Sequence, residues 1–219
     1  MEWDWHFAAE IMPALLAGLV ITIKITLLSF VVAVIVGLLI ALAKSSTQPY
    51  INRPVTLIAE GIRRTPLLVQ LYFLFYVLPD FGVVLSPFVA GVIALGIHTS
   101  TYISETFRAG IESVPAGQWE AAKACNLSQF QVWREIILPQ AIPPMIPPLG
   151  NYLISLFKET PILSVITVMD LMGMALLEAN TSYRYLEPIT MVAVGFLLLS
   201  LVSAQLIKFV DIRLRSGVA

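Results

Sequence analysis

Two ionisable residues of opposite sign, Lys158 and Glu159, stand next to each other in an otherwise apolar part of the sequence. Charged groups in an apolar medium are costly unless they are paired or reach water. A solute that carries both an ammonium and a carboxylate needs one partner of each sign, and this pair offers both. The structural alternative is pairing with other charges of the same helix bundle, such as Lys24 or Asp170. The candidate solute-contacting residues in this stretch are Asn151, Lys158, Glu159 and Thr160.

A second polar group interrupts an apolar segment between His98 and Tyr102, and Gln70 places an amide inside another apolar segment. Polar side chains inside such segments usually face the interior of a helix bundle or a water-filled cavity. They either contact a solute or form hydrogen bonds between helices, and the sequence leaves both readings open. The candidate residues are Gln70, His98, Thr99 and Tyr102. Nearby, Glu105 and Arg108 are three residues apart on one helical face, so we expect a structural ion pair there.

The longest polar interruption between apolar segments is Pro115–Pro139, which we call the loop segment. The residues from Gln118 to Ala124 are good helix formers, and their alanines would let another surface approach the backbone closely. Ser128 begins a second helix with an S-x-x-Q capping box. Asn126 lies between the two helices, where a left-handed backbone conformation is useful. The pattern predicts helix, tight turn, helix, with a break at Pro139.

Several catalytic signatures are missing from the sequence. There is no phosphate-binding G-x-x-x-x-G-K-[ST] loop, no H-E-x-x-H zinc motif and no G-x-S-x-G nucleophile motif. The two histidines, His6 and His98, are far apart. We therefore expect no catalytic residue, no metal site and no cofactor-binding site in this chain.

The composition indicates an integral membrane protein. Of the 219 residues, 58% are apolar and only 12% are charged, against about 25% charged in soluble domains. The mean hydropathy is +0.86. A net charge of −1 gives no reason to expect nucleic-acid binding. The single cysteine, Cys125, cannot form an internal disulfide, and the acidic N-terminus lacks the basic region of a cleavable signal peptide.

Charge-free runs predict about five membrane-spanning helices. A first helix begins near Ile11 and places Lys24 near the outer boundary, and four prolines should kink the fourth span. We expect Thr160–Leu177 to be a partly buried helix on the outer side, interrupted by Asp170. The predicted spans are Ile25–Ala43, Thr65–Pro79, Phe88–Ser104, Ile136–Phe157 and Pro188–Ile207, and Thr65–Pro79 is short for a crossing.

Orientation follows from the basic residues, which are enriched on the cytoplasmic side of membrane proteins. Ten of the 13 lie in the connector between the first two spans, around the loop segment, and at the C-terminus. The prediction is an N-terminus outside, a C-terminus inside, and a cytoplasmic loop segment. These ten are Lys44, Arg53, Arg63, Arg64, Arg108, Lys123, Arg134, Lys208, Arg213 and Arg215.

Several of these motifs together resemble those of permease subunits of ABC-type importers. The loop segment resembles the EAA loop of that family through Glu120, Ala121 and Ala122, with Asn126 where the family has glycine. Arg63–Gln70 is close to the R-G-T-P-L-L-V-Q pattern of polar amino-acid permeases, and Lys158–Pro161 is similar to their K-D-T-S element. By resemblance, the residues that couple to the ATPase are Gly117, Gln118, Glu120, Ala121, Ala122, Asn126, Ile136, Leu138 and Pro139.

The resemblance extends from about Leu16 to Arg213 and implies an all-α integral membrane protein with the type I importer permease fold, MetI-like, and a cytoplasmic coupling helix. It implies an external segment 1–11, a permease domain 12–213 and a cytoplasmic tail 214–219. The implied partners are two ATP-binding cassette ATPase subunits that hold ATP and magnesium, a second permease subunit, identical or paralogous, an external solute-binding protein and the lipid bilayer. The implied location is the bacterial inner membrane.

Three alternatives remain at this stage. Within the family, Tyr76–Phe81 is similar to ectoine permeases, so the solute is either a polar amino acid or a compatible solute such as ectoine. An ion-driven secondary carrier is disfavoured by the odd number of spans and the lack of a second repeat. A membrane-embedded enzyme would need a catalytic constellation, and only Glu105, His98 and Glu159 are available.

Overall fold

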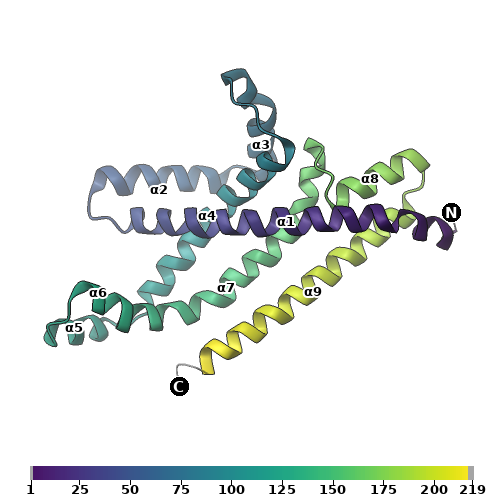
Figure 1. Ribbon diagram of the computed structural model, residues 1–219. Helices are drawn as coiled ribbons and strands as arrows, with labels where there is room; N and C mark the ends of the chain where they lie inside the picture. Colours follow the sequence, from purple (N-terminus) through teal and green to yellow (C-terminus); the bar gives the residue numbers. More distant parts are fainter. Residues whose placement is uncertain (1, 217–219) are drawn as a thin grey trace.

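The computed structural model describes residues 2–216, which form helices joined by short turns, with no β-strand in that range. Figure 1 shows the long helix α1 running the length of the molecule, with α5 and α6 at one end and α8 at the other. The N-terminus lies at the α8 end and the C-terminus lies toward the α5 end (Figure 1). The helices are α1 (Trp5–Lys44), α2 (Pro49–Arg64), α3 (Leu67–Tyr72), α4 (Pro87–Glu112), α5 (Ala116–Ala124), α6 (Gln129–Gln131), α7 (Leu138–Glu159), α8 (Leu171–Ser182) and α9 (Leu186–Ser216).

Helix α1 starts at Trp5, six residues before Ile11, because Asp4 caps it. The Asp4 carboxylate accepts hydrogen bonds from the backbone N–H of His6 and Phe7, at 2.9 and 3.2 Å. Most of the segment 1–11 is therefore part of the first helix. The C-terminal tail 214–219 falls largely outside the residues whose structure is described.

The pairing of α1 with α4 is the most extensive helix contact in the fold. Small residues allow it: a Cβ on Gly37 would lie 3.0 Å from the backbone oxygen of Ser100, and one on Gly96 would lie 2.7 Å from Val32. Close approach of two helix backbones through small residues is the usual way in which membrane helices associate. This contact fixes the position of α4, which carries most of the polar residues discussed below.

Three described helices are long and apolar enough to cross a membrane: α1, α4 and α9, the last over Leu186–Arg213. A fourth crossing is formed if Gln129–Ile166 and Leu171–Ser182, which meet at a bend of 46°, act as one broken span. The remaining predicted span corresponds to Leu67–Phe81, an apolar helix too short to pass the same criterion. The all-helical membrane fold is confirmed, with three or four candidate spans in place of about five.

The connector between the first two spans contains a helix of its own. Helix α2 contacts α1 and α4 and ends at Arg64. Pro66, in an extended conformation, then directly precedes α3 as its N-cap residue. The chain continues through a π-helical turn, Phe73–Val77, and a 3₁₀ turn, Leu78–Phe81.

The predicted break at Pro139 is wrong. Pro139 is the second residue of α7, and a π-helical turn, Val132–Ile137, precedes that helix directly. The helical segment Gln129–Ile166 is continuous, so Pro139 lies within it and does not end it. The interior prolines Pro143, Pro144, Pro147 and Pro148 all lie inside α7, so a kink there stays a prediction.

The prediction of one helix over Thr160–Leu177 is also wrong. A 3₁₀ segment, Thr160–Ile166, ends at Thr167, which has a φ of 63°. Asp170 then caps a separate helix, α8, by accepting a hydrogen bond from the Gly173 N–H at 2.9 Å. Asp170 therefore interrupts the segment by starting a new helix rather than by sitting inside one.

Candidate functional site

The loop segment folds as a helical hairpin, as its local signals predicted. Helix α5 ends at Ala124, Asn126 follows with a φ of 53°, and the Leu127 N–H bonds back to the Ala122 carbonyl at 3.2 Å. Ser128 forms the capping box with Gln131, whose side-chain oxygen accepts from the Ser128 N–H at 3.0 Å. Figure 1 shows this hairpin protruding at the end of the molecule opposite to the N-terminus.

The hairpin has an apolar cluster of its own. Ala122, which the resemblance placed among the ATPase-coupling residues, lies inside this cluster. Ala122 is 1% exposed and packs with Val132, Ile137 and their neighbours. The Trp119 and Trp133 rings meet edge to face at 5.4 Å, which joins α5 to the π-helical turn. Ala122 is thus an internal packing residue, because helix periodicity turns it inward, and it cannot belong to an outward contact surface.

The other predicted coupling residues lie mostly on the outside of the hairpin. Gln118 also accepts a hydrogen bond from the Gln140 amide of α7, at 3.3 Å. Ile136 is half-buried. The exposed members are Gly117, Gln118, Glu120, Ala121, Asn126, Leu138 and Pro139.

A polar pocket of about 180 Å³ lies between α4 and α7. The structure brings together here four residues that the sequence singled out from two distant segments. Its carboxylate, Glu159, is half-buried. We refer to it as the polar pocket; its lining is His98, Thr99, Tyr102, Tyr152, Ser155 and Glu159.

Gln70 reaches the polar pocket from the start of α3. Its side-chain oxygen lies 3.2 Å from His98 Nδ1, while its amide nitrogen donates to the Ile62 carbonyl at 2.6 Å. The same nitrogen lies 2.7 Å from the Thr65 hydroxyl. Gln70 therefore forms hydrogen bonds between helical segments, as one of the two readings predicted, and its contact with a solute stays a prediction.

Three predicted residues are not in the pocket. Asn151 and Lys158 are exposed. Thr160 is fully buried and donates its hydroxyl to the Phe157 carbonyl at 3.0 Å. On α7 the two neighbours differ: Glu159 lines the pocket, whereas Lys158, about 100° further around the helix, is exposed outside it.

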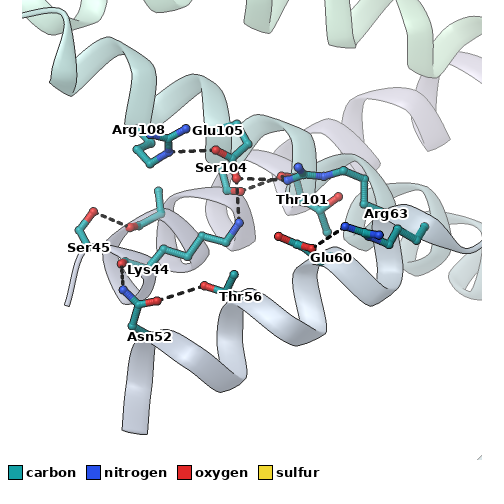
Figure 2. A network of polar contacts seen from close by, with 12 residues as sticks. Lys44, Ser45, Asn52, Thr56, Glu60, Arg63, Thr101, Ser104, Glu105 and Arg108 are labelled. Carbon is teal, nitrogen blue, oxygen red and sulfur yellow. Dashed lines mark hydrogen bonds and ion pairs between the residues drawn. The ribbon is translucent and has the colours of Figure 1, made fainter. Parts of the chain in front are cut away.

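An ion cluster is centred on Glu105, about one turn further along α4 than Tyr102 of the polar pocket. Figure 2 shows this cluster. Glu105 accepts from Lys44 at 2.8 Å, from Arg63 at 3.3 Å and from Arg108 at 2.9 Å. The predicted pair of Glu105 and Arg108 is confirmed, and the structure adds cations from α1 and α2. We call these four residues the Glu105 cluster, and it ties three helices together.

Sequence reasoning missed Tyr152, Ser155 and Arg63. Tyr152, Ser155 and Glu159 follow the i, i+3, i+7 spacing of one helix face, so the first two could have been found by projecting α7 from the carboxylate. Arg63 gave no such signal, because its partners belong to α4. Its guanidinium carbon lies 5.2 Å from the centre of the Tyr102 ring, and its Nη2 donates to the Thr101 carbonyl at 2.6 Å.

Comparisons with known proteins identify the family of the chain. The sequence profile of the family described as binding-protein-dependent transport system inner membrane component matches residues 33–216. A probable amino-acid ABC transporter permease of Sinorhizobium fredii is 42% identical over 95% of this chain and 90% of its own length. The arginine transport system permease ArtQ of Bacillus subtilis is 34% identical over 99% of this chain and 100% of its own.

Among solved structures, a chain from the crystal structure of an amino acid ABC transporter with histidines is 38% identical. It superposes with a TM-score of 0.91 over 97% of this chain and 100% of its own. A chain of the MetNI methionine ABC transporter, at 21% identity and a TM-score of 0.73 over 96% and 98%, shares the fold. The chain therefore belongs to the family of binding-protein-dependent transport system inner membrane components, and it is a permease of the ABC amino-acid importer type.

Proposed function

We propose that this permease conducts a small polar amino acid along the seam between α4 and α7, and that the polar pocket is where the solute binds. The observation that carries the proposal is the pocket itself, in which one carboxylate and several neutral donors from two helices converge. Larger hollows line the same chain, including one of about 450 Å³ beside α1 and α9, but its lining holds no charged residue.

The pocket chemistry fits an α-amino acid. The Glu159 carboxylate would pair with the solute ammonium, since a desolvated charge needs a partner of opposite sign. The solute carboxylate would accept hydrogen bonds from neutral donors, among them the hydroxyls of Thr99, Ser155 and Tyr102. Lys158, the cationic partner expected from the sequence, is exposed and outside the pocket. Relatives of this chain bear the names of cystine, arginine, glutamine and octopine permeases.

The narrower ectoine proposal depends on the stretch Tyr76–Phe81 alone. That stretch belongs to a π-helical and a 3₁₀ turn and contributes no residue to the lining of the polar pocket. We therefore carry ectoine forward as one solute in the test below.

Energy would enter through the hairpin of the loop segment. We propose that its exposed residues, with Glu120 and Ala121 at the centre, dock onto a separate ATPase subunit that binds ATP and magnesium. Two such ATPases, a second permease subunit and an external solute-binding protein would complete the transporter. The transporter would sit in the bacterial inner membrane. A short helix with one apolar side already packed offers its other side to a partner.

This assembly requires the N-terminus outside the cell and the hairpin in the cytoplasm. Cys125, which is exposed in the hairpin, is a native probe for the second statement. We expect a membrane-impermeant thiol reagent to label Cys125 only from the cytoplasmic side. Glu2→Cys in a Cys125→Ser background should be labelled only from outside, and labelling of both positions from one side would refute the orientation.

Glu159→Gln tests the solute pocket. The exchange keeps the shape of the side chain and removes the charge that would hold the ammonium, a charge-assisted contact that contributes about 1.5–3 kcal/mol. We expect uptake of amino acids from a panel that includes ectoine to fall about tenfold or more in proteoliposomes with the ATPase and binding protein, while assembly is unchanged.

The matched control is Glu10→Gln, an exposed glutamate of α1. Its uptake should equal that of the parent. Uptake should also require ATP and survive collapse of the ion gradients, which separates this proposal from an ion-driven carrier. Normal uptake by Glu159→Gln, or loss of assembly, would show that the carboxylate does not bind the solute.

A further inference from the structure

The polar pocket is continued by a second hollow along the same two helices. This hollow, of about 310 Å³, is lined on α4 by Glu105, Thr106, Ala109 and Gly110 and on α7 by Pro144 and Pro148. On α4 the residues of this hollow come after those of the polar pocket in the sequence. On α7 the residues of this hollow come before those of the polar pocket, as expected for two antiparallel helices. The two hollows therefore lie one after the other, and the second, which we call the proline cavity, lies on the hairpin side.

Two tyrosines stand at the boundary between the hollows. Tyr102 is the last α4 residue of the polar pocket before Glu105, and Tyr152 is the first α7 residue of the pocket after Pro148. Their ring centres are 6.3 Å apart, within the range of aromatic contact. The tyrosine pair therefore lies between the two hollows.

Arg63 holds one side of the tyrosine pair. Its guanidinium carbon lies 5.2 Å from the centre of the Tyr102 ring, a cation–π distance. The guanidinium is itself anchored by the Thr101 carbonyl at 2.6 Å and by Glu105 at 3.3 Å (Figure 2). The Nε of Arg63 is buried and has no hydrogen-bond partner among the described residues. The guanidinium is therefore held by the hydrogen bonds of Nη2 and by the Tyr102 ring.

The end of α2 thus contacts the polar pocket at two points. Arg63 touches Tyr102, and the neighbouring Ile62 carbonyl accepts from Gln70, which in turn contacts His98. Lys44 of α1 shares the Glu105 carboxylate with Arg63. Any shift of α2 relative to α4 would therefore change both ends of the pocket together.

We propose that Arg63 is a positioning residue that holds Tyr102 against Tyr152, so that the tyrosine pair closes the hairpin-side end of the pocket. The proposal rests on the proposed function of the pocket. It assigns to the Glu105 cluster a part in the gating of the pathway, besides its part in joining the helices. Arginine suits this position because it can stack on a ring and bond a carboxylate at the same time.

The test is the access of a thiol reagent to Ser155→Cys in the polar pocket, measured in the complete transporter in a Cys125→Ser background. The reagent is added from the cytoplasmic side, without nucleotide and with a non-hydrolysable ATP analogue. In the state in which the parent is labelled more slowly, Arg63→Gln should raise the labelling rate about fivefold or more, because the ring loses its anchor.

Arg64→Gln is the matched control, since Arg64 is exposed and, among the described residues, its ion pair is with Glu60 in the same helix. Its labelling rate should equal that of the parent. Tyr102→Leu should raise the rate without touching the anchor. If Arg63→Gln does not assemble, Arg63→Lys serves instead, because it keeps a charge for Glu105 and loses the planar contact; it too should be labelled faster.

Unchanged labelling in the assembled Arg63 variant would overturn the proposal, whatever Tyr102→Leu does. Failure of the solute pocket would be seen separately, as normal uptake by Glu159→Gln. Faster labelling of Arg63→Gln together with normal uptake by Glu159→Gln would keep the gate and remove the solute assignment.

Discussion

The hairpin and the polar pocket are built in opposite ways. The hairpin is formed within one continuous stretch, where Ala122 packs on Val132 and its neighbours only a few turns away in the chain. The pocket joins residues from α4 and α7 that are at least 50 positions apart, and Gln70 contacts its His98 from a third helix. A local structure can be perturbed without moving the membrane helices, whereas the pocket depends on how those helices pack.

The largest expected effect is in the hairpin, at Ala122→Asp. The new carboxylate would be buried without a partner, which costs more than about 3 kcal/mol. The hairpin should open, and we expect proteolysis within Pro115–Pro139 to accelerate at least a hundredfold, the ATPase to be lost on purification and uptake to disappear.

Ala121→Asp separates folding from docking. Ala121 is exposed, so the substitution should change the stability of the hairpin by no more than about 0.5 kcal/mol. If the exposed side is the docking surface, Ala121→Asp should keep the resistance to proteolysis and still lose the ATPase. Retention of the ATPase by Ala121→Asp would show that the ATPase contacts another part of the hairpin.

The same contrast explains what the sequence could predict. The capping box at Ser128, the left-handed Asn126 and the pair of Glu105 and Arg108 depend on residues three or four apart, and all three predictions are confirmed. Which face of α5 is buried depends on the neighbouring π-helical turn. The sequence therefore did not show that Ala122 packs inside the hairpin. Pro139 was misjudged because the sequence did not show that a π-helical turn, Val132–Ile137, carries the helical segment on into α7.

Predictions about the pocket were limited by packing between distant helices. The occurrence of polar side chains within apolar segments was enough to identify His98, Tyr102 and Glu159 as candidates. The sequence did not say that Lys158 turns away from the pocket, which follows only when the face of α7 that meets α4 is known. Arg63 could not be assigned for the same reason, since all the groups that hold it lie on another helix.

A smaller loss of stability is expected at Glu105, which joins three helices that are far apart in the chain. Glu105→Gln removes the negative charge shared by Lys44, Arg63 and Arg108 and leaves Lys44, whose side chain is 10% exposed, without a counter-charge. Hydrogen bonds to charged groups contribute about 1.5–3 kcal/mol, and partial exposure reduces this. We expect a loss of about 2 kcal/mol, seen as a lower unfolding temperature of the detergent-solubilised permease.

Glu60→Gln is the control for that measurement. Glu60 pairs with Arg64 on the exposed side of α2, and exposed pairs of this kind contribute no more than about 0.5 kcal/mol. The two exchanges are chemically identical, so a difference between them reports the environment. Equal unfolding temperatures would mean that the Glu105 cluster does not hold the three helices together.

The smallest effect should come from the turn of the hairpin, at Asn126→Gly. Asn126 has a φ of 53°, which asparagine tolerates and glycine adopts freely. Glycine would relieve a small backbone strain, but it also gains more conformational freedom when the hairpin opens, and the two effects partly cancel. Proteolysis of the hairpin should therefore change by no more than about threefold.

Asn126→Ala is the contrasting variant. Alanine would have to adopt the same left-handed backbone, which it tolerates less well than asparagine, at a cost of about 1 kcal/mol, and the variant should be cleaved about fivefold faster. If both variants were cleaved at the rate of the parent, the left-handed turn would not limit the opening of the hairpin. Its stability would then come from the apolar cluster around Ala122 alone.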